Sequence, residues 1–332
     1  MKVYVITGIT GLLGRSLAWA VLSGASGIRE EIQIIGIGRN LGRMQAVFPD
    51  AVRRGMTFVE ADCCMMGQLS GGLERMQADY LIHCAAPTAS AYMVTHPVET
   101  ADCVVAGTRN MLELAGRLRV KSMVYLSSME VYGKVEDTGR PRREDELGDI
   151  GLTSARSCYS LGKRMAEHYC HIYQQEFHVP VKVARLAQVF GRGVRMDDNR
   201  VYMQFARAAY EGRDIVLKTG GNSMGNYCST SDAVRAVFTI LEKGADGEVY
   251  NVVNEANTMR IRDMAKLVAE EVAHGAIGIR VKPEDTAKTG YAPDTGLRLS
   301  GEKLRGLGWQ PVQGLTEMYG EVLGEIAKEY RK

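Results

Sequence analysis

The sequence has little of several features that mark specialised classes of protein. Its 332 residues include only eight prolines and six histidines, and no apolar run approaches the roughly 20 residues needed to cross a bilayer. Neither sign of charge dominates, because 41 Lys and Arg face 39 Asp and Glu. Without a basic excess to neutralise phosphates, a nucleic-acid partner is not expected, and neither is a membrane span. The 45% of apolar residues excludes a disordered chain.

Cysteine is present but lacks the patterns that signal disulfide frameworks or zinc. The seven cysteines are an odd number, contain no C-x-x-C pair and lie mostly in apolar stretches, which is typical of reduced, buried thiols. The histidines do not cluster with them, so no metal is expected. Residues 1–14 resemble a strand followed by a glycine turn more than a signal peptide, and we therefore expect a cytoplasmic location.

What the sequence does have is glycine, at 37 residues, and apolar runs that alternate with helical patterns. We expect strands at 1–7, 32–38, 57–61, 80–85, 122–127 and 181–186, and helices at 12–23, 97–118 and 157–176. Near-continuous apolar strands interleaved with helices predict an α/β fold, a doubly wound parallel sheet of the Rossmann type. Such sheets bind ligands at the carboxyl ends of their strands.

The alternation loosens after residue 190. Helical patterns recur at 201–211 and 262–272, a strand pattern at 248–253, and residues 298–309 are rich in glycine. We assign residues 1–184 and roughly 225–254 to a dinucleotide-binding Rossmann domain. Residues 185–224 and 255–332 would form a smaller C-terminal α/β substrate-binding domain that packs directly on it, since no linker separates them.

The opening VYVITGITGLLG places Gly8, Gly11 and Gly14 between a strand and a helix. A tight turn of this kind brings backbone N–H groups and a helix N-terminus to a pyrophosphate, and therefore predicts a bound dinucleotide. The second strand ends in Ile37-Gly38-Arg39-Asn40 with no acidic residue to read the ribose hydroxyls. Arg39, or Arg43 one turn later, could pair with a 2′-phosphate, which slightly favours NADP over NAD. Arg39 could equally stack on adenine or face solvent.

Other polar residues follow strand ends. Asp62 is placed to contact the adenine amino group, unless it is a plain turn residue. Tyr159 and Lys163 are four apart on a predicted helix and share one face. A nearby ammonium and the positive nicotinamide ring would favour the phenolate, which could exchange a proton with a carbinol during hydride transfer. Such pairs are common on ordinary helices, but Ser128 and Glu130 follow the fifth strand, where ligands bind. Ser128 could hydrogen-bond the reacting oxygen, and Glu130 could be a second acid or base or a turn residue.

Together these motifs resemble the extended short-chain dehydrogenase/reductase family of nucleotide-sugar enzymes. The resemblance covers nearly the whole chain: TGITGLLG at 7–14, HCAA at 83–86, SSMEVYG at 127–133, YSLGK at 159–163 and LGWQP at 307–311. Within that family, the stretches 83–97, 157–167, 183–191 and 196–201 are most similar to UDP-glucuronate decarboxylases. The resemblance implies an NAD(P)-dependent enzyme and a homodimer formed through a four-helix bundle, for which 98–118 and 158–177 are the matching helices.

The resemblance also implies roles for individual residues. Ser128, Tyr159 and Lys163 match the catalytic triad, and Glu130 matches a glutamate that assists decarboxylation. The residues implied to contact the cofactor, besides the three glycines, Arg39, Asp62, Tyr159 and Lys163, are Thr10, Leu12, Leu13, Cys63, Ala85 and Ala86. Thr88, Ser128, Gln188 and Arg200 are implied to contact the substrate.

Three positions depart from the family pattern. Met129 stands where decarboxylases usually carry Ser and dehydratases carry Asp, and a thioether cannot donate a proton. Gly225 replaces an arginine that often meets the diphosphate, and Gln188 replaces a commonly found Asn. The expected reaction is oxidation of a nucleotide sugar at C4 followed by epimerisation or decarboxylation. The alternatives are an NADPH-dependent 4-keto-sugar reductase and a non-catalytic dinucleotide sensor.

Overall fold

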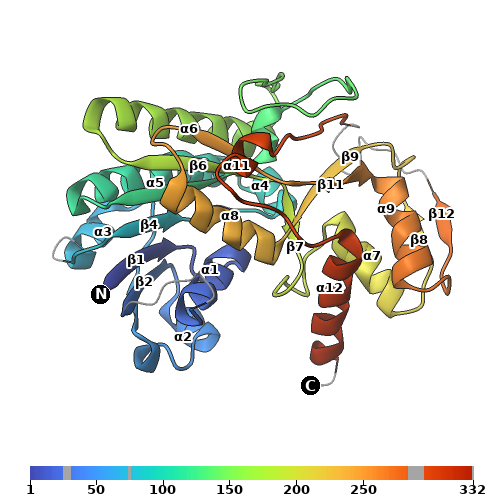
Figure 1. The fold of residues 1–332 in the computed structure, drawn as a ribbon, viewed down its shortest axis with the longest axis horizontal. Helices are drawn as coiled ribbons and strands as arrows, with labels where there is room; N and C mark the ends of the chain where they lie inside the picture. The colour runs from blue at the N-terminus through green and yellow to red at the C-terminus, as the bar shows by residue number, and fades with distance from the viewer. Residues whose placement is uncertain (25–30, 74–75, 283–294, 331–332) are drawn as a thin grey trace.

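A seven-stranded, fully parallel sheet forms the centre of the first lobe of the molecule (Figure 1). The computed structural model describes residues 1–24, 31–73, 76–282 and 295–330. The strands of this sheet are β1 (Lys2–Thr7), β2 (Ile32–Gly38), β3 (Met56–Glu60), β4 (Tyr80–His83), β5 (Ser122–Ser128), β6 (Val181–Leu186) and β10 (Val249–Val252). Their order is β10-β6-β5-β4-β1-β2-β3. This arrangement confirms the Rossmann-type parallel sheet that the sequence predicts.

Both faces of the sheet are covered by helices, which explains why its strands are mostly apolar. In β1, Tyr4 and Ile6 point into one core while Val3 and Val5 point into the other. The first face is covered by α1 (Leu12–Leu22), α2 (Leu41–Val47) and α8 (Thr230–Lys243). The second is covered by α3 (Met66–Leu73), α5 (Pro97–Leu118) and α6 (Ser157–Phe177), as Figure 1 shows. Because successive strand side chains point to opposite faces, both sets of positions are mostly apolar, and the buried exceptions such as Lys182 and Arg185 of β6 have hydrogen-bond partners.

Smaller sheets build the second lobe. A three-stranded sheet contains β7 (Gln188–Phe190), β9 (Met224–Ser229) and β11 (Asn254–Arg260), and β8 (Ile215–Leu217) pairs with β12 (Ile279–Val281). Around them lie α7 (Val201–Tyr210), α9 (Ile261–Leu267), a π-helical turn (Val268–Val272) and α12 (Leu315–Glu329), whereas α11 (Glu302–Arg305) packs against β10 of the large sheet. The elements of the second lobe share a separate core built on Phe190, Tyr202, Tyr227 and Tyr319. The chain returns to the large sheet through α8, which directly follows β9.

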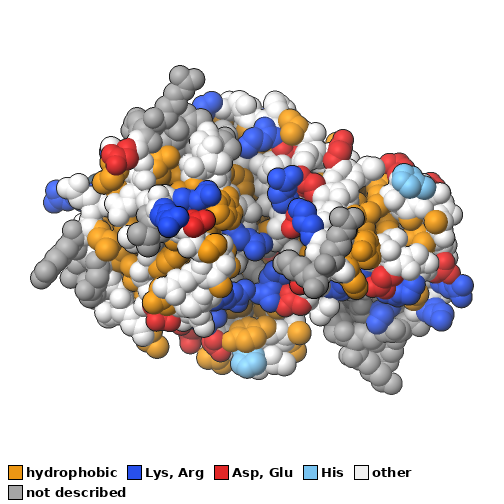
Figure 2. Space-filling model, turned by 90° about the horizontal axis from the view of Figure 1, so that it is seen from below, with side chains coloured by type: hydrophobic (Ala, Val, Ile, Leu, Met, Phe, Trp, Pro, Cys, Tyr) orange, Lys and Arg blue, Asp and Glu red, His pale blue; other side chains and the backbone are white. Residues whose placement is uncertain are grey.

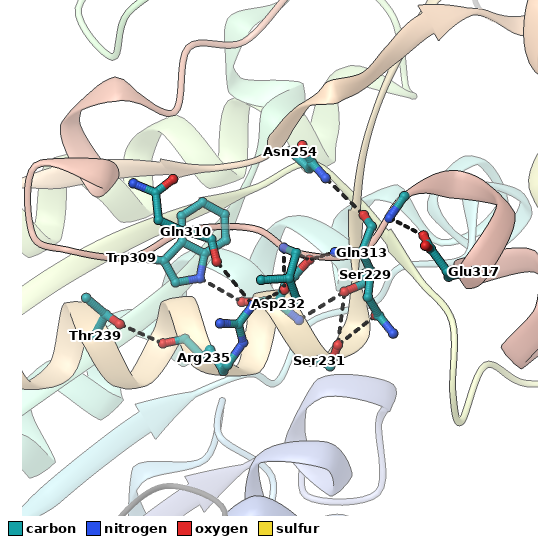
Figure 3. A network of polar contacts seen from close by, with 12 residues as sticks. Ser229, Ser231, Asp232, Arg235, Thr239, Asn254, Trp309, Gln310, Gln313 and Glu317 are labelled. Carbon is teal, nitrogen blue, oxygen red and sulfur yellow. Dashed lines mark hydrogen bonds and ion pairs between the residues drawn. The ribbon is translucent and has the colours of Figure 1, made fainter.

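A buried polar network fastens the segment after α11 to the start of α8 (Figure 3). Asp232, which is fully buried, accepts hydrogen bonds from the backbone N–H groups of Val312 and Gln313, each at 3.1 Å. Trp309 donates its indole N–H to the Asp232 carbonyl at 3.1 Å. The carboxylate also pairs with Arg235 one turn along the helix. These contacts are a structural clasp that holds the LGWQP motif and the two residues after it against α8, with Trp309 in the same core as that helix.

Candidate active site

The carboxyl edge of the large sheet brings together the turn after β1 and the chain that leaves β4. Thr7 Oγ1 accepts hydrogen bonds from the backbone N–H groups of Cys84 and Ala85, at 3.1 and 3.2 Å. Its other contact, at 2.7 Å, is with Nδ1 of His83. These bonds hold the two chain segments at a fixed separation, so the glycine turn and the HCAA motif form one surface.

The glycine turn is as tight as its sequence suggests. Gly8 has φ +61°, and a Cβ placed there would lie 2.9 Å from the backbone of Ala85. A Cβ on Gly14 would lie 2.3 Å from the Gly8 carbonyl oxygen, and the Gly11 N–H donates to the same oxygen at 2.9 Å. Only glycine permits this turn, which leaves the N-terminus of α1 without a side-chain cap. This cradle fits the pyrophosphate of a dinucleotide, and the half-buried Thr10, Leu12 and Leu13 lie along it.

Positive charge gathers beside this turn. Lys and Arg side chains surround the hollow between the two lobes on the face drawn in Figure 2. Arg15, on the first turns of α1, donates a hydrogen bond to the Gly193 carbonyl across the lobes. Burial lowers the pKa of Arg15, and the charges of Arg43 and Arg195 lower it further. An anionic cofactor would relieve this repulsion.

At the carboxyl ends of β2 and β3, where the sequence predicts the adenosine site, lies a hollow of about 320 Å³ lined by Arg39, Glu60, Ala61, Asp62 and Gln68. Asp62 accepts a hydrogen bond from the backbone N–H of Cys64 at 2.9 Å, so it shapes this turn. Cys63 is buried, and burial raises the pKa of its thiol to about 12. Arg39 reaches toward α5, where its guanidinium lies 3.5 Å from the Glu99 carboxylate. The sequence did not single out Glu60, although its place at the end of a strand is the signal that could have done so.

Ser128, Tyr159 and Lys163 come together where the carboxyl end of β5 meets the first turns of α6. Tyr159, 6% exposed, lies close enough to Ser128 for the serine hydroxyl to lower the pKa of the phenol. Lys163, 2% exposed, donates from Nζ to the Leu126 carbonyl at 2.7 Å. Its Nζ lies 5.6 Å from the centre of the Tyr159 ring. The three groups that the sequence proposes as a triad are therefore neighbours in space.

Burial controls the protonation of this group. It raises the pKa of Tyr159 above its ordinary value, and the nearby Glu130 charge raises it further. A hydrogen bond from Ser128 and the charges of Arg156 and Arg200 act in the opposite direction. Burial also lowers the pKa of Lys163 to about 8. The tyrosine is thus a neutral phenol at neutral pH until more positive charge comes close.

Glu130 is held by two side chains that the sequence did not single out. Arg156 donates to Oε1 at 2.8 Å and Ser160 donates to Oε2 at 3.1 Å. The backbone N–H of Glu130 donates to Ser128 Oγ at 3.2 Å. Because Arg156 and Ser160 lie on either side of Tyr159 in α6, the carboxylate is anchored beside the phenol. Arg156 and Ser160 are four residues apart, a spacing that places them on one side of a helix. Sequence alone does not reveal their shared partner, because Glu130 lies 26 and 30 residues away.

The residues proposed to contact substrate are spread over both lobes. Arg200 caps the start of α7, bonds the Asp198 carboxylate at 3.0 Å and still acts electrostatically on Tyr159. Thr88 is exposed in the loop between β4 and α4 (Ser90–Thr95), and Gln188 is the first residue of β7. Within the described ranges, no hydrogen bond links Thr88 or Gln188 to the Tyr159 group.

The Gly225 departure is built into the packing of the second lobe. A Cβ at this position would lie 2.3 Å from the hydroxyl oxygen of Tyr227 and 2.5 Å from its ring. Tyr227 is fully buried and packs edge-on against Phe190, so it cannot easily move aside. The ring of Tyr227 thus fills the space that a side chain at position 225 would need. Sequence reasoning did not foresee this contact.

Neither a metal centre nor a membrane helix emerges from the described residues. No three His, Cys, Asp or Glu side chains gather as metal ligands in that part of the chain. The described helices include none that is long and apolar enough to span a bilayer.

Comparison with known proteins finds similarity over most of the chain. The model of the NAD dependent epimerase/dehydratase family matches residues 4–253. UDP-glucuronic acid decarboxylase 1 of Danio rerio is 29% identical over 257 residues, which span 76% of this chain and 58% of that protein.

Solved structures with the same fold include enzymes crystallised with either nicotinamide dinucleotide. UDP-glucuronic acid 4-epimerase from Bacillus cereus, in complex with UDP-glucuronic acid and NAD, has a TM-score of 0.79 at 20% identity, covering 99% of this chain and 100% of that one. RMD from Pseudomonas aeruginosa, complexed with NADPH, has a TM-score of 0.78 at 20% identity with the same coverage.

Proposed function

Because the chain belongs to the NAD dependent epimerase/dehydratase family, we propose that it oxidises a nucleotide sugar at C4 and converts it by epimerisation or decarboxylation. The observation that carries this proposal is that Ser128, Tyr159 and Lys163 lie close together, with Ser128 at the carboxyl end of β5 in the sheet whose β1 leads into the glycine turn. The similarity to UDP-glucuronic acid decarboxylases supports a UDP-sugar as the substrate class. A cytoplasmic location remains a prediction from cysteine usage.

The cofactor in this proposal is a nicotinamide dinucleotide, which supplies a hydride acceptor when bound. Gly8, Gly11 and Gly14 would hold its pyrophosphate, together with Thr10, Leu12 and Leu13. Asp62 and Cys63 would contact the adenosine, and Ala85, Ala86, Tyr159 and Lys163 the nicotinamide half. Any preference for NADP would have to come from Arg39, whose guanidinium pairs with Glu99.

Proton transfer is the task of Tyr159 in this proposal. The phenol oxygen removes the proton of the C4 hydroxyl, and Ser128 donates a hydrogen bond to the C4 oxygen. Because burial raises the pKa of Tyr159, positive charge near the ring is needed to make the phenolate. Arg156 and Arg200 already lower the pKa of Tyr159, and the Nζ of Lys163 lies 5.6 Å from the centre of its ring.

Glu130 and Met129 limit which outcome follows oxidation. A ketone at C4 acidifies C3 and C5, so one first step serves several reactions. Met129 cannot protonate a leaving hydroxyl, which argues against dehydration. In this proposal Glu130, whose carboxylate pairs with Arg156, would lie near the sugar and assist decarboxylation. A 4-keto-sugar reductase is the alternative that Arg39 would favour, whereas the intact triad argues against a non-catalytic sensor.

The proposal is tested by incubating the purified protein with a panel of nucleotide sugars, with and without NADPH, and identifying products by NMR and mass spectrometry. We expect conversion of a UDP-sugar without net consumption of the dinucleotide. Tyr159→Phe should abolish it, whereas Tyr169→Phe on the same helix should not. Stoichiometric consumption of NADPH would establish the reductase instead, and unchanged turnover in Tyr159→Phe would overturn the triad.

A further inference from the structure

The sequence of β2 contains no acidic residue, but the neighbouring strand β3 places one beside the end of β2. In the parallel pairing of β2 and β3, Glu60 lies opposite Gly38, immediately before Arg39. The Glu60 carboxylate accepts a hydrogen bond from the backbone N–H of Leu41, the first residue of α2, at 3.0 Å. The adjacent strand therefore delivers a carboxylate to the place where the sequence of β2 has only Arg39.

The charges around this point do not favour a phosphate. Glu60, Asp62 and Arg39 line the same hollow, and Glu99 pairs with the Arg39 guanidinium at 3.5 Å. The one guanidinium of this hollow is thus paired with Glu99 and shares the hollow with two further carboxylates. Arg43, the other cation considered for a 2′-phosphate, is close enough to Arg15 and Asp197 to lower the pKa of both groups. Its backbone N–H is already taken by the side chain of Asn40 at 2.7 Å.

The two dinucleotides differ at this end only by a group on the ribose 2′-oxygen. A free 2′-hydroxyl can donate a hydrogen bond to a carboxylate, whereas a 2′-phosphate carries negative charge and needs donors. Here the Leu41 N–H is occupied by Glu60, and the Glu60 carboxylate itself would repel the phosphate.

We propose that Glu60 is the residue that selects NAD over NADP in this protein. The proposal rests on the dinucleotide site of the proposed function, and it reverses the slight preference for NADP drawn from Arg39. Arg39 alone does not restore that preference, because it must leave Glu99 and still share the hollow with Glu60 and Asp62.

Binding of the two dinucleotides to the full chain, measured by isothermal titration calorimetry without sugar, tests the proposal. We expect NAD+ to bind at least tenfold more tightly than NADP+. Glu60→Gln keeps an oxygen that can accept from Leu41 but removes the charge, and should narrow this ratio about tenfold. Glu31→Gln, at the opposite end of β2, is the matched control and should leave it unchanged. Glu99→Gln should narrow the ratio less, since that carboxylate acts through Arg39.

The outcomes separate this inference from the function it rests on. Tighter binding of NADP+ by the wild-type protein, or equal ratios for Glu60→Gln and Glu31→Gln, would overturn the role of Glu60. Selective binding of NAD+ with no conversion of any nucleotide sugar would overturn the proposed reaction and leave the selection intact. If the wild-type protein were folded, as judged by circular dichroism, but bound neither dinucleotide, both the role of Glu60 and the proposed function would be wrong.

Discussion

Around Tyr159, two charged side chains that touch each other act on the phenol in opposite directions. The Glu130 charge raises the pKa of Tyr159 and the Arg156 charge lowers it. Glu130→Gln should therefore move the rise of kcat with pH to lower pH, and Arg156→Gln should move it to higher pH, each by up to about one unit. The pH dependence of turnover on the substrate found in the panel measures both. Shifts in the same direction would contradict this account, since a purely structural effect has no reason to reverse sign.

His83 makes the folded protein sensitive to acid. Its ring is 2% exposed and bonds Thr7, and burial, aided by the Lys163 charge, lowers its pKa to about 3. Between an ordinary pKa near 6.5 and about 3, only the unfolded chain binds the proton, so stability falls as pH falls through that window. The loss from this group should reach roughly 2 kcal/mol at pH 5.

Urea unfolding at pH 7.5 and pH 5.0 measures this loss. His83→Gln should lower stability at pH 7.5 but reduce the difference between the two pH values. His168→Gln, an exposed position on α6, should keep the wild-type difference. An equal difference in all three proteins would show that other groups cause the acid sensitivity.

At the scale of elements, the β1–α1 turn should tolerate no side chain at Gly14. Gly14→Ala would bring its Cβ to 2.3 Å from the Gly8 carbonyl oxygen, so the turn must open. We expect binding of NAD+ to fall at least a hundredfold in calorimetry. Gly320→Ala, where a Cβ meets nothing within 4 Å on α12, should bind normally and gain roughly 0.5–1 kcal/mol of stability. Normal binding by Gly14→Ala would show that the turn does not hold the dinucleotide.

The start of α8 depends on Asp232 in a comparable way. Asp232→Ala leaves the N–H groups of Val312 and Gln313 and the Arg235 guanidinium without their shared acceptor. Loss of a buried, hydrogen-bonded carboxylate should lower the free energy of unfolding by about 3 kcal/mol. Urea denaturation measures it, with Glu242→Ala, exposed on the same helix, as the control. Surface substitutions scatter by about 0.5 kcal/mol. If the free energy of unfolding of Asp232→Ala differed from that of the control by less than this, the clasp would not contribute to stability.

The elements that the sequence predicts well are the buried strands of the large sheet and the long helices that pack on it with one apolar face. The expected strand at 181–186 is β6, and the helices at 97–118 and 157–176 match α5 and α6 to within one residue. The three-residue strands β7, β8 and β12 are too short to carry a period, and they form only because the second lobe pairs them. Residues 262–272 change from α-helix to a π-helical turn at Val268, which apolar spacing does not reveal.

At the scale of the whole molecule, the site contains residues that sequence spacing can find and residues that only the fold brings together. Gly8 with Gly14, or Tyr159 with Lys163, lie close in sequence, so spacing finds them. Contacts such as Leu41 with Glu60, or Glu130 with Arg156, join residues 19 or 26 positions apart and need the sheet to bring them together. Arg39 illustrates the difference, because its sequence context points to a phosphate while its partner in the folded chain is Glu99.

The surface of α5 and α6 bears on the assembly of the protein. Met111, Leu112 and Leu114, which the sequence could not assign to core or interface, are buried within one chain. Exposed apolar residues remain on the two helices: Val98 at 73%, Met165 at 40% and Phe177 at 58%. Helices of 22 and 21 residues run for about 30 Å, long enough for an interface of standard size.

We therefore expect a homodimer through these helices, as the resemblance implies, with twice the 36.5 kDa mass of one chain in light scattering. Met165→Glu buries a charge in that interface and should shift the mass toward the monomer at micromolar concentration, because an unpaired buried charge costs several kcal/mol. Val281→Glu, equally apolar and exposed on β12 in the other lobe, should stay dimeric. Since Tyr159 and Lys163 lie on the inner face of α6, NAD+ binding by the Met165→Glu monomer shows whether the helix needs its partner to hold the site. A wild-type monomer, or a dimer unaffected by Met165→Glu but lost in Val281→Glu, would place the contact elsewhere.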